Sequence, residues 1–317
     1  MKKILLLVSL LLVLASSFTY AKSDEEYFKE AQQFEIEKKY DKAITSYSKA
    51  IEINPKSGYF LNRGSLYDST GNFPFALRDY NQAIQISPHN PFGYYNRGLF
   101  FLNRSEYDAA ISDLSKAIDL KPLNHFYNAR GSAYTQQKKY DFALTDYNKS
   151  IELNPTFSGS YYDRARVYAF QKNYTKAIAD LSTLIKFDPT HKTAYLYRGR
   201  LFNLAKESEK AREDFTQDIK LNPNRIESYE YRAILSFNKK DYFNAMADAE
   251  YLLSLDPENY KALFLLTLSY NNLKDTQKAQ LHFEKIIKLK EKSPSTVPQE
   301  HIEYLKRELN RAEDTTP

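Results

Sequence analysis

A regular spacing of alanines constrains the fold of this chain more than any other feature of its sequence. Eight alanines follow one another at steps of 33 or 34 residues: Ala43, Ala76, Ala110, Ala143, Ala177, Ala211, Ala245 and Ala279. A repeat of this length indicates an array of one supersecondary unit, which buries its apolar face only against neighbouring copies. The chain length of 317 residues therefore does not set the number of domains, as it would in an ordinary globular protein.

Three other positions keep the same register. Twelve residues before the alanine stands a small residue in seven units: Ala31, Gly64, Gly98, Gly131, Ala165, Gly199 and Ala233, with Thr267 in the eighth. Twelve residues after the alanine stands proline in seven units: Pro55, Pro88, Pro122, Pro155, Pro189, Pro223 and Pro257. Three residues after the small position stands an aromatic residue: Phe34, Tyr67, Phe101, Tyr134, Tyr168, Phe202 and Tyr270, with Ser236 in the seventh unit.

These marks predict two helices in each unit. Each unit contains two segments in which apolar residues recur three and four positions apart. A polar turn separates the two segments, and proline ends the second. A glycine inside a helix costs about 1 kcal/mol relative to alanine, so the four glycines at the small position need a packing reason. We expect the second helix of each unit to lie against the first through its own alanine, with the aromatic residue filling the space beside that contact.

A 34-residue helix–turn–helix unit with these marks resembles the tetratricopeptide repeat. The resemblance covers residues 22–291, as eight repeats near 24–56, 57–90, 91–123, 124–157, 158–191, 192–225, 226–259 and 260–291. It implies an all-α fold, an α-α superhelix in the form of a right-handed solenoid. Where the family often has tryptophan, this chain has Tyr27, Phe60, Tyr94, Tyr127, Tyr161, Tyr195, Tyr229 and Leu263. The eighth repeat has Glu291 in place of the final proline, which marks the end of the array.

The first 21 residues predict a secretory signal peptide. Lys2 and Lys3 precede a twelve-residue run that is apolar except for Ser9, and Ala21 supplies the small residue after which we expect cleavage. The alternative is an uncleaved anchor, although the apolar run is short for a membrane span. Cleavage leaves an exported protein, periplasmic or secreted, and removing the two lysines lowers the net charge from +5 to +3. So small a charge favours neither nucleic acid nor a membrane surface as a partner.

Residues 292–317 predict a linker and a last helix over 298–313. Ile302, Leu305 and Leu309 share one face of that helix. A solenoid leaves an apolar face on its last repeat, so we interpret this helix as a cap rather than as a partner-binding tail.

Arginine and aspartate vary together between the repeats. Arginine precedes the small residue in six units, and aspartate stands sixteen residues later: Arg63 and Asp79, Arg97 and Asp113, Arg130 and Asp146, Arg164 and Asp180, Arg198 and Asp214, Arg232 and Asp248. The two units without the arginine have Glu30 and Leu266, and they lack the aspartate too. Because the guanidinium fork suits a bidentate carboxylate, we predict six ion pairs between the helices of a repeat. These arginines are then structural, although Asn-Arg-Gly at 62–64 and 96–98 by itself suggests an anion site.

No motif predicts catalysis, a metal or a cofactor. The chain has no cysteine, no HExxH, no phosphate loop, no GxSxG and no glycine-rich nucleotide turn. Five histidines stand far apart, and we expect His89, His125 and His191 to be solvated residues in or beside turns. An enzyme whose site is assembled from distant repeats is the remaining alternative.

The resemblance implies that the first helix of each repeat lines a concave groove. The candidate groove residues are Asn62, Tyr95, Asn96, Asn128, Tyr162, Asp163, Arg166, Tyr197, Arg200 and Tyr231. Tyrosine is rigid and amphipathic, and amide side chains pair with an extended backbone, so we predict a non-enzymatic scaffold that binds a peptide or protein segment. Two alternatives stay open: the tyrosines pack between adjacent repeats, or they stack on sugar rings in a glycan or cell-wall-associated binding protein.

One subfamily of these repeats grips the C-terminal carboxylates of chaperones with two lysines, two asparagines and an arginine. The corresponding places of the first three repeats hold Phe28, Gln32, Asn62, Phe92 and Asn96. Only Asn62 matches, and a start one repeat later matches only Asn96. The sequence therefore does not support that mode of binding.

Overall fold

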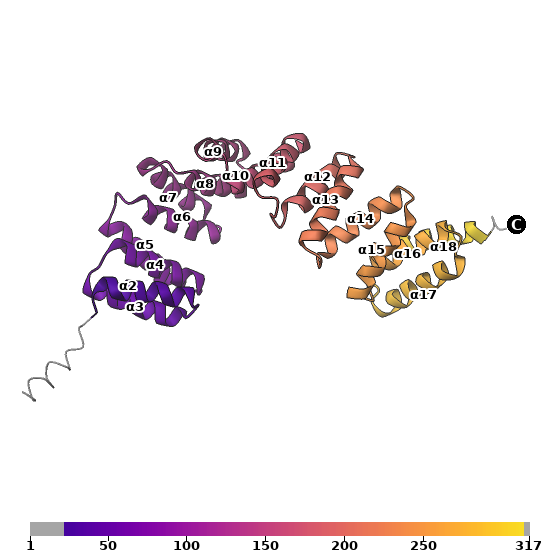
Figure 1. The fold of residues 1–317 in the computed structure, drawn as a ribbon, viewed down its shortest axis with the longest axis horizontal. Coiled ribbons are helices and arrows are strands. Elements are labelled where there is room, and N and C mark those ends of the chain that lie inside the picture. Colours follow the sequence, from indigo (N-terminus) through magenta and orange to yellow (C-terminus); the bar gives the residue numbers. More distant parts are fainter. Residues whose placement is uncertain (1–21, 314–317) are drawn as a thin grey trace, which may run out of the picture. The chain divides into compact units, whose positions relative to one another are not determined.

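Helices make up the regular structure of the described part of the chain. The computed structural model describes residues 22–313, so the predicted signal segment lies outside the described residues. Within 22–313 there are 17 α-helices and no strand, drawn in chain order in Figure 1. The all-α repeat fold expected from the spacing of the alanines is confirmed.

The helices belong to two compact units, divided after Pro155. The first unit contains α2 (Asp24–Ile36), α3 (Tyr40–Ile53), α4 (Ser57–Ser69), α5 (Phe73–Ile86), α6 (Pro91–Asn103), α7 (Tyr107–Leu120), α8 (Asn124–Gln136) and α9 (Tyr140–Leu153). The second contains α10 (Ser158–Phe170), α11 (Tyr174–Phe187), α12 (Ala194–Leu204), α13 (Ser208–Leu221), α14 (Ile226–Asn238), α15 (Tyr242–Leu255), α16 (Tyr260–Asn272), α17 (Thr276–Lys292) and α18 (Gln299–Glu313).

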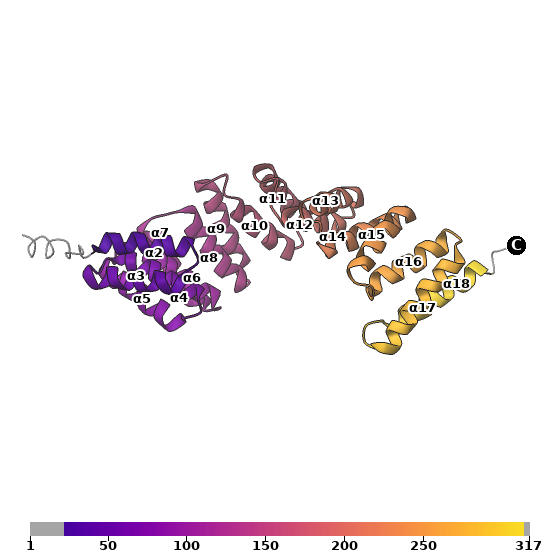
Figure 2. The ribbon, with the colours of Figure 1, turned by 60° about the horizontal axis from the view of Figure 1, so that its bottom comes forward.

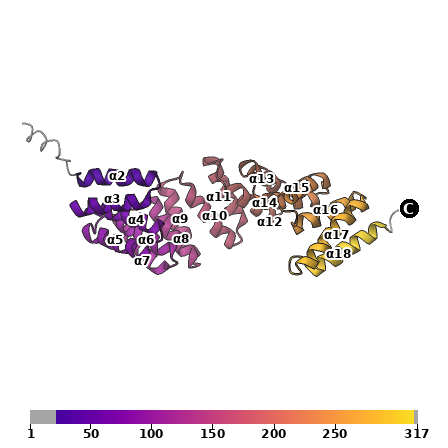
Figure 3. The same ribbon diagram turned by 90° about the horizontal axis from the view of Figure 1, so that it is seen from below.

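Each predicted repeat is one pair of contacting helices. Within both units the even-numbered helix packs on the odd-numbered helix that follows it, and that helix packs on the next pair. Figure 3 shows α2 and α3 side by side in the first unit. In the second unit α18 contacts both α16 and α17 (Figure 2). It begins at Gln299, one residue later than the sequence predicts.

The turn inside each repeat depends on one residue in the left-handed region. It is Gly71 in the second repeat, with φ of 80°, and a residue with a side chain in the others: Lys38, Ser105, Lys138, Lys172, Lys206, Lys240 and Lys274. In the first repeat, the Lys38 amide donates to the Glu35 carbonyl at 2.9 Å, and the Lys39 amide donates to the Phe34 carbonyl at 2.8 Å. These bonds satisfy carbonyls at the helix end. Lysine is not a usual marker of such a turn, so the sequence did not reveal this position.

All eight alanines of the 34-residue series are fully buried. The small position does face the second helix, but its closest neighbours differ from the expected alanine. A Cβ atom on Gly131 would lie 2.8 Å from the Tyr147 ring, and one on Gly199 would lie 2.9 Å from the Phe215 ring. Each ring belongs to the residue four positions after the alanine. The missing side chain thus makes room for a large residue one turn further along the second helix.

Candidate binding surface

The six arginines that precede the small residues are held inside the repeats. Each forms its predicted ion pair, and the shortest nitrogen–oxygen distance in every pair is 2.6–2.8 Å. In every pair Nε and Nη2 donate to the two carboxylate oxygens. In the pair of Arg232 with Asp248, the hydrogen bond to Asp248 raises the pKa of the arginine. The arginine is therefore held in its charged form within the repeat.

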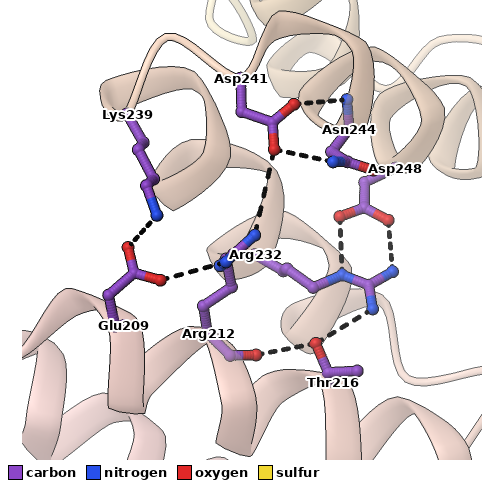
Figure 4. A network of polar contacts seen from close by, with 8 residues as sticks. All are labelled: Glu209, Arg212, Thr216, Arg232, Lys239, Asp241, Asn244 and Asp248. Atoms are coloured by element: carbon purple, nitrogen blue, oxygen red, sulfur yellow. Dashed lines mark hydrogen bonds and ion pairs between the residues drawn. The ribbon is translucent and has the colours of Figure 1, made fainter.

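The remaining guanidinium nitrogen reaches the preceding repeat. Nη1 of Arg232 on α14 donates to Thr216 on α13 at 3.3 Å, and the Thr216 hydroxyl donates to the Arg212 carbonyl at 2.8 Å (Figure 4). Four other arginines of the series have an equivalent acceptor: Ser48, Asn81, Ser115 and Ser182. These acceptors lie five residues after the buried alanine. The regular spacing of these acceptors from the alanines is visible in the sequence, but it was not part of the prediction.

The aromatic residues at the position of the family tryptophan lie beside the same arginines. The guanidinium carbon lies 5.6–6.0 Å from the ring three residues earlier in all six repeats. A cation at this distance from a ring face is attracted by its quadrupole. The six arginines are therefore surrounded by partners of their own chain.

The first helices of the repeats carry the predicted groove residues, and in each unit we call the surface they form its first-helix face. In the first unit it includes Asn62 on α4, Tyr95 and Asn96 on α6 and Asn128 on α8, all half-buried. A hollow of about 350 Å³ lies between α4 and α6, where Asn96 joins Ser65 and Asp68 in its lining. This hollow is polar and open, and it exposes amide and hydroxyl groups of the first unit.

Tyr95 packs on the next repeat. Its ring lies 4.7 Å from that of Phe126 and 5.1 Å from that of His125, and burial raises the pKa of its phenol. His125 lies within α8 and is half-buried, so the expectation of a solvated turn histidine is wrong for this residue. Burial also lowers the pKa of His125, because desolvation disfavours the imidazolium.

In the second unit the first-helix face carries Tyr162, Asp163 and Arg166 on α10, Tyr197 and Arg200 on α12, and Tyr231 on α14. Tyr231 stacks on Phe215 of the preceding repeat, with ring centroids 5.0 Å apart and an interplanar angle of 8°. The ring of Tyr162 lies 5.9 Å from that of Tyr197. Arg166 lies 3.7 Å from Asp163, and Arg200 lies 3.3 Å from Glu227. The structure therefore brings these residues onto neighbouring helices of one unit.

An apolar pocket of about 280 Å³ continues this face between α14 and α16. Its lining includes Ile234, Phe237, Phe264, Leu265 and Leu268. The imidazole of His301 on α18 also lines the pocket and forms a hydrogen bond with the hydroxyl of Tyr260. The cap helix thus completes the wall of a pocket that the sequence analysis did not predict.

The described residues offer no arrangement for metal chemistry. Within 22–313, no group of three or more histidine, aspartate or glutamate side chains is placed to hold a metal ion. In the same range, none of the helices combines the length and the apolar composition needed to cross a bilayer. The first-helix face presents hydrogen-bonding groups, two exposed arginines and one apolar pocket. These groups are suited to binding a ligand.

Sequence models of the family match most of the repeats. Models described as tetratricopeptide repeat match residues 27–57, 93–122, 126–157, 146–179 and 261–289, and a model described as TPR repeat matches residues 64–104. Together these ranges cover more than half of the chain.

Curated relatives match a shorter part. Heat shock protein STI1 of Saccharomyces cerevisiae is 34% identical over 102 residues, which are 32% of this chain and 17% of that protein. Serine/threonine-protein phosphatase 5 of Homo sapiens is 33% identical over 102 residues, 32% of this chain and 20% of that protein. The chain thus spans a fifth or less of the length of these two relatives.

Solved structures share the fold. The C-terminal part of a TPR repeat-containing protein from Cytophaga hutchinsonii superposes with a TM-score of 0.65 at 18% identity, over 77% of this chain and 98% of that one. PilW, described as a type IV pilus biogenesis factor, superposes with a TM-score of 0.60 at 18% identity, over 65% of this chain and 96% of that one. The register of the repeats, the paired helices and these matches agree, and the chain belongs to the tetratricopeptide-repeat family.

Proposed function

We propose that this protein is a non-enzymatic, exported scaffold that binds a peptide or protein segment on its first-helix face. The observation that carries the proposal is that two sets of arginines differ in their exposure and in their partners. The six structural arginines are enclosed by partners, whereas the side chains of Arg166 and Arg200 are 39% and 47% exposed on the first-helix face of the second unit, which also carries an apolar pocket. An interface centre of this kind, with aromatic, arginine and apolar side chains together, is typical of protein recognition.

The relatives support the general class of function. The name of Hsp70-Hsp90 organizing protein 2 of Arabidopsis thaliana, which is 33% identical over 102 residues, describes a protein that organises other proteins. The chaperone-tail residues of that subfamily are not matched here, so the partner of this chain is expected to differ. Export rests on the predicted signal peptide. Intact mass measurement of the protein from its native host tests it, because cleavage after Ala21 predicts a chain that begins at Lys22.

Glycan binding, the other candidate, receives less support from the tyrosines. Stacking on a sugar needs an open ring face, and the rings of Tyr95 and Tyr231 already contact aromatic rings of neighbouring repeats. Packing therefore accounts for two of the tyrosines that the glycan hypothesis would use.

Site-specific photo-crosslinking tests the proposal. A benzophenone amino acid is placed at Asn96 or Tyr162 on the first-helix face, and at the exposed Phe243 on α15 as control. In the native host we expect protein adducts from the first two positions and none from the third. Adducts from the control position only, or binding of the mature chain to a glycan array without any protein adduct, would contradict the proposal.

A further inference from the structure

At one position of the first helix, the residue changes from charged to apolar along the repeats of the second unit. Arg166, Arg200, Ile234 and Leu268 stand 34 residues apart, at the same place in four successive repeats. Two adjacent repeats thus present a cation, and the next two present an apolar side chain to one pocket. A ligand that follows this row meets first charge and then an apolar surface.

The two exposed arginines keep donors for a ligand. Each lies near one carboxylate, at 3.7 Å for Arg166 with Asp163 and at 3.3 Å for Arg200 with Glu227. The structural pairs differ, because each is bidentate and at most 24% of the arginine side chain is exposed. Exposed single contacts between such side chains contribute little to stability. A ligand carboxylate can therefore replace Glu227 on Arg200 at small cost.

Tyr197 stands on α12 one turn before Arg200, and its ring contacts that of Tyr162 on α10, the helix that carries Arg166. Burial raises the pKa of its phenol, and the positive charges of Arg166 and Arg200 both act against that rise. Its ring packs 5.9 Å from Tyr162, which fixes the phenol on the first-helix face. Two guanidinium groups and a phenol O–H are hydrogen-bond donors, and a carboxylate offers about four lone-pair positions to accept from them.

Helix α14 joins the cationic site to the apolar pocket. Its Glu227 approaches Arg200, and its Glu230, one turn later, lines the pocket and pairs with Lys261 at 2.8 Å. Helix α13 packs on both α12 and α14, so the pocket between α14 and α16 lies more than one helix spacing of about 8–10 Å from the arginines on α10 and α12. An extended peptide, at about 3.3 Å for each residue, covers such a distance in several residues.

From this arrangement we propose that the second unit binds a peptide segment with an acidic side chain between Arg166 and Arg200 and a large apolar side chain, several residues away, in the pocket of α14 and α16. This inference rests on the proposed function and specifies its partner. Its anion is a side-chain carboxylate in mid-chain, so no free C-terminus is required.

Fluorescence anisotropy with synthetic peptides measures this recognition directly. The probes carry two glutamates and one phenylalanine, in both orders, with glycine-serine spacers of increasing length. The mature chain should bind best at a spacing of several residues and at least about tenfold more weakly when glutamine replaces both glutamates or alanine replaces phenylalanine. Raising the ionic strength from about 0.01 M to about 0.15 M shortens the Debye length from about 30 to about 8 Å and should weaken binding.

Four variants assign the effect to the site. Arg200→Gln and Ile234→Ala should each weaken binding by at least about tenfold. Glu227→Gln should strengthen it, because it removes the carboxylate that competes for Arg200. Arg78→Gln on α5 and Phe243→Ala on α15, both exposed and outside this face, are the matched controls and should leave binding unchanged.

The outcomes separate this inference from the proposed function. Equal binding of the glutamine peptides, or unchanged binding by Arg200→Gln, overturns the inference. If crosslinking at the first-helix face still yields protein adducts in that case, the scaffold function stands and only the acidic-apolar partner is wrong. If neither peptides nor crosslinked proteins bind, both proposals fail.

Discussion

The arginine that precedes each small residue joins three helices through one planar group. In Arg232, Nε and Nη2 bind Asp248 on the second helix of the same repeat, and Nη1 reaches Thr216 on the second helix of the preceding repeat (Figure 4). Lysine has no planar fork and could not make these bonds in fixed directions. The first repeat has no preceding repeat, and there Glu30 instead accepts from Ser46 at 3.2 Å and pairs with Lys22 at 2.7 Å.

At the residue scale, removal of the aspartate of one such pair should lower the free energy of unfolding. Asp248→Ala leaves the guanidinium of Arg232 largely enclosed without its carboxylate, so we expect a loss of about 3 kcal/mol in the free energy of unfolding. Urea denaturation followed by circular dichroism measures it. The double variant Arg232→Met with Asp248→Ala should recover part of the loss, since it leaves no charge unpaired.

The control for this prediction is Lys239→Ala. It removes an ion pair with Glu209 in which both side chains are more than half exposed, and it should change the unfolding midpoint little. Equal effects of Asp248→Ala and Lys239→Ala would show that the buried pairs do not stabilise the repeats.

At the scale of the element, two features determine how the two helices of a repeat pack on each other. The first is a left-handed residue in the turn, which in six repeats is a lysine. The second is the small residue on the first helix, which a large side chain of the second helix contacts closely. At Gly131 this large side chain is Tyr147, which is almost completely buried and whose hydroxyl is 3.0 Å from that of Thr135. A local pattern of residues thus becomes a fixed contact between two helices.

Two glycine substitutions of opposite effect test this packing. Gly131→Ala would place a methyl group 2.8 Å from the Tyr147 ring, and overpacking of this kind should lower the free energy of unfolding by about 1–3 kcal/mol. Gly58→Ala on α4 meets no atom within 4 Å and should raise stability by up to about 1 kcal/mol through helix propensity. Urea midpoints of both variants measure the difference. A stabilising Gly131→Ala would contradict the packing reason for glycine at this position.

At the scale of the whole molecule, each repeat needs a neighbour to cover its apolar side, and the last repeat has α18. Val297, Ile302, Leu305 and Leu309 are buried in one cluster with Phe283, Ile286 and Leu289 of α17. The same helix contributes His301 to the wall of the apolar pocket. The segment therefore both covers apolar residues of α16 and α17 and shapes part of the first-helix face of the second unit.

Disruption of this cap should destabilise the second unit. Leu305 is fully buried, and Leu305→Ala should cost about 2–5 kcal/mol. Hydrogen exchange measured by mass spectrometry should show faster exchange in α16 and α17, which contact α18. The adjacent, exposed Lys306→Ala is the control and should leave exchange unchanged. Unchanged exchange in Leu305→Ala would mean that α18 does not support the last repeat.

The repeat register, the helix pairs and the arginine–aspartate pairs were predictable because each depends on residues at regular separations, which are 12 and 16 positions within a repeat and 33 or 34 between repeats. A helix pair converts such separations into contacts by its own geometry. The glycine contact with Tyr147 and the left-handed lysines were not predictable in the same way, because packing and turn geometry override the usual preference of those residue types.

For the candidate surface too, some features were predictable from the sequence and others were not. Sequence spacing alone placed Tyr95, Arg200 and Tyr231 on first helices, since these positions recur in every repeat. Only the tertiary structure decided that Tyr95 and Tyr231 pack on neighbouring rings, that Arg200 is exposed beside Tyr197, and that His301 joins Ile234 in one pocket. Exposure and cavities arise from side chains of several helices at once, and no separation along the chain encodes them.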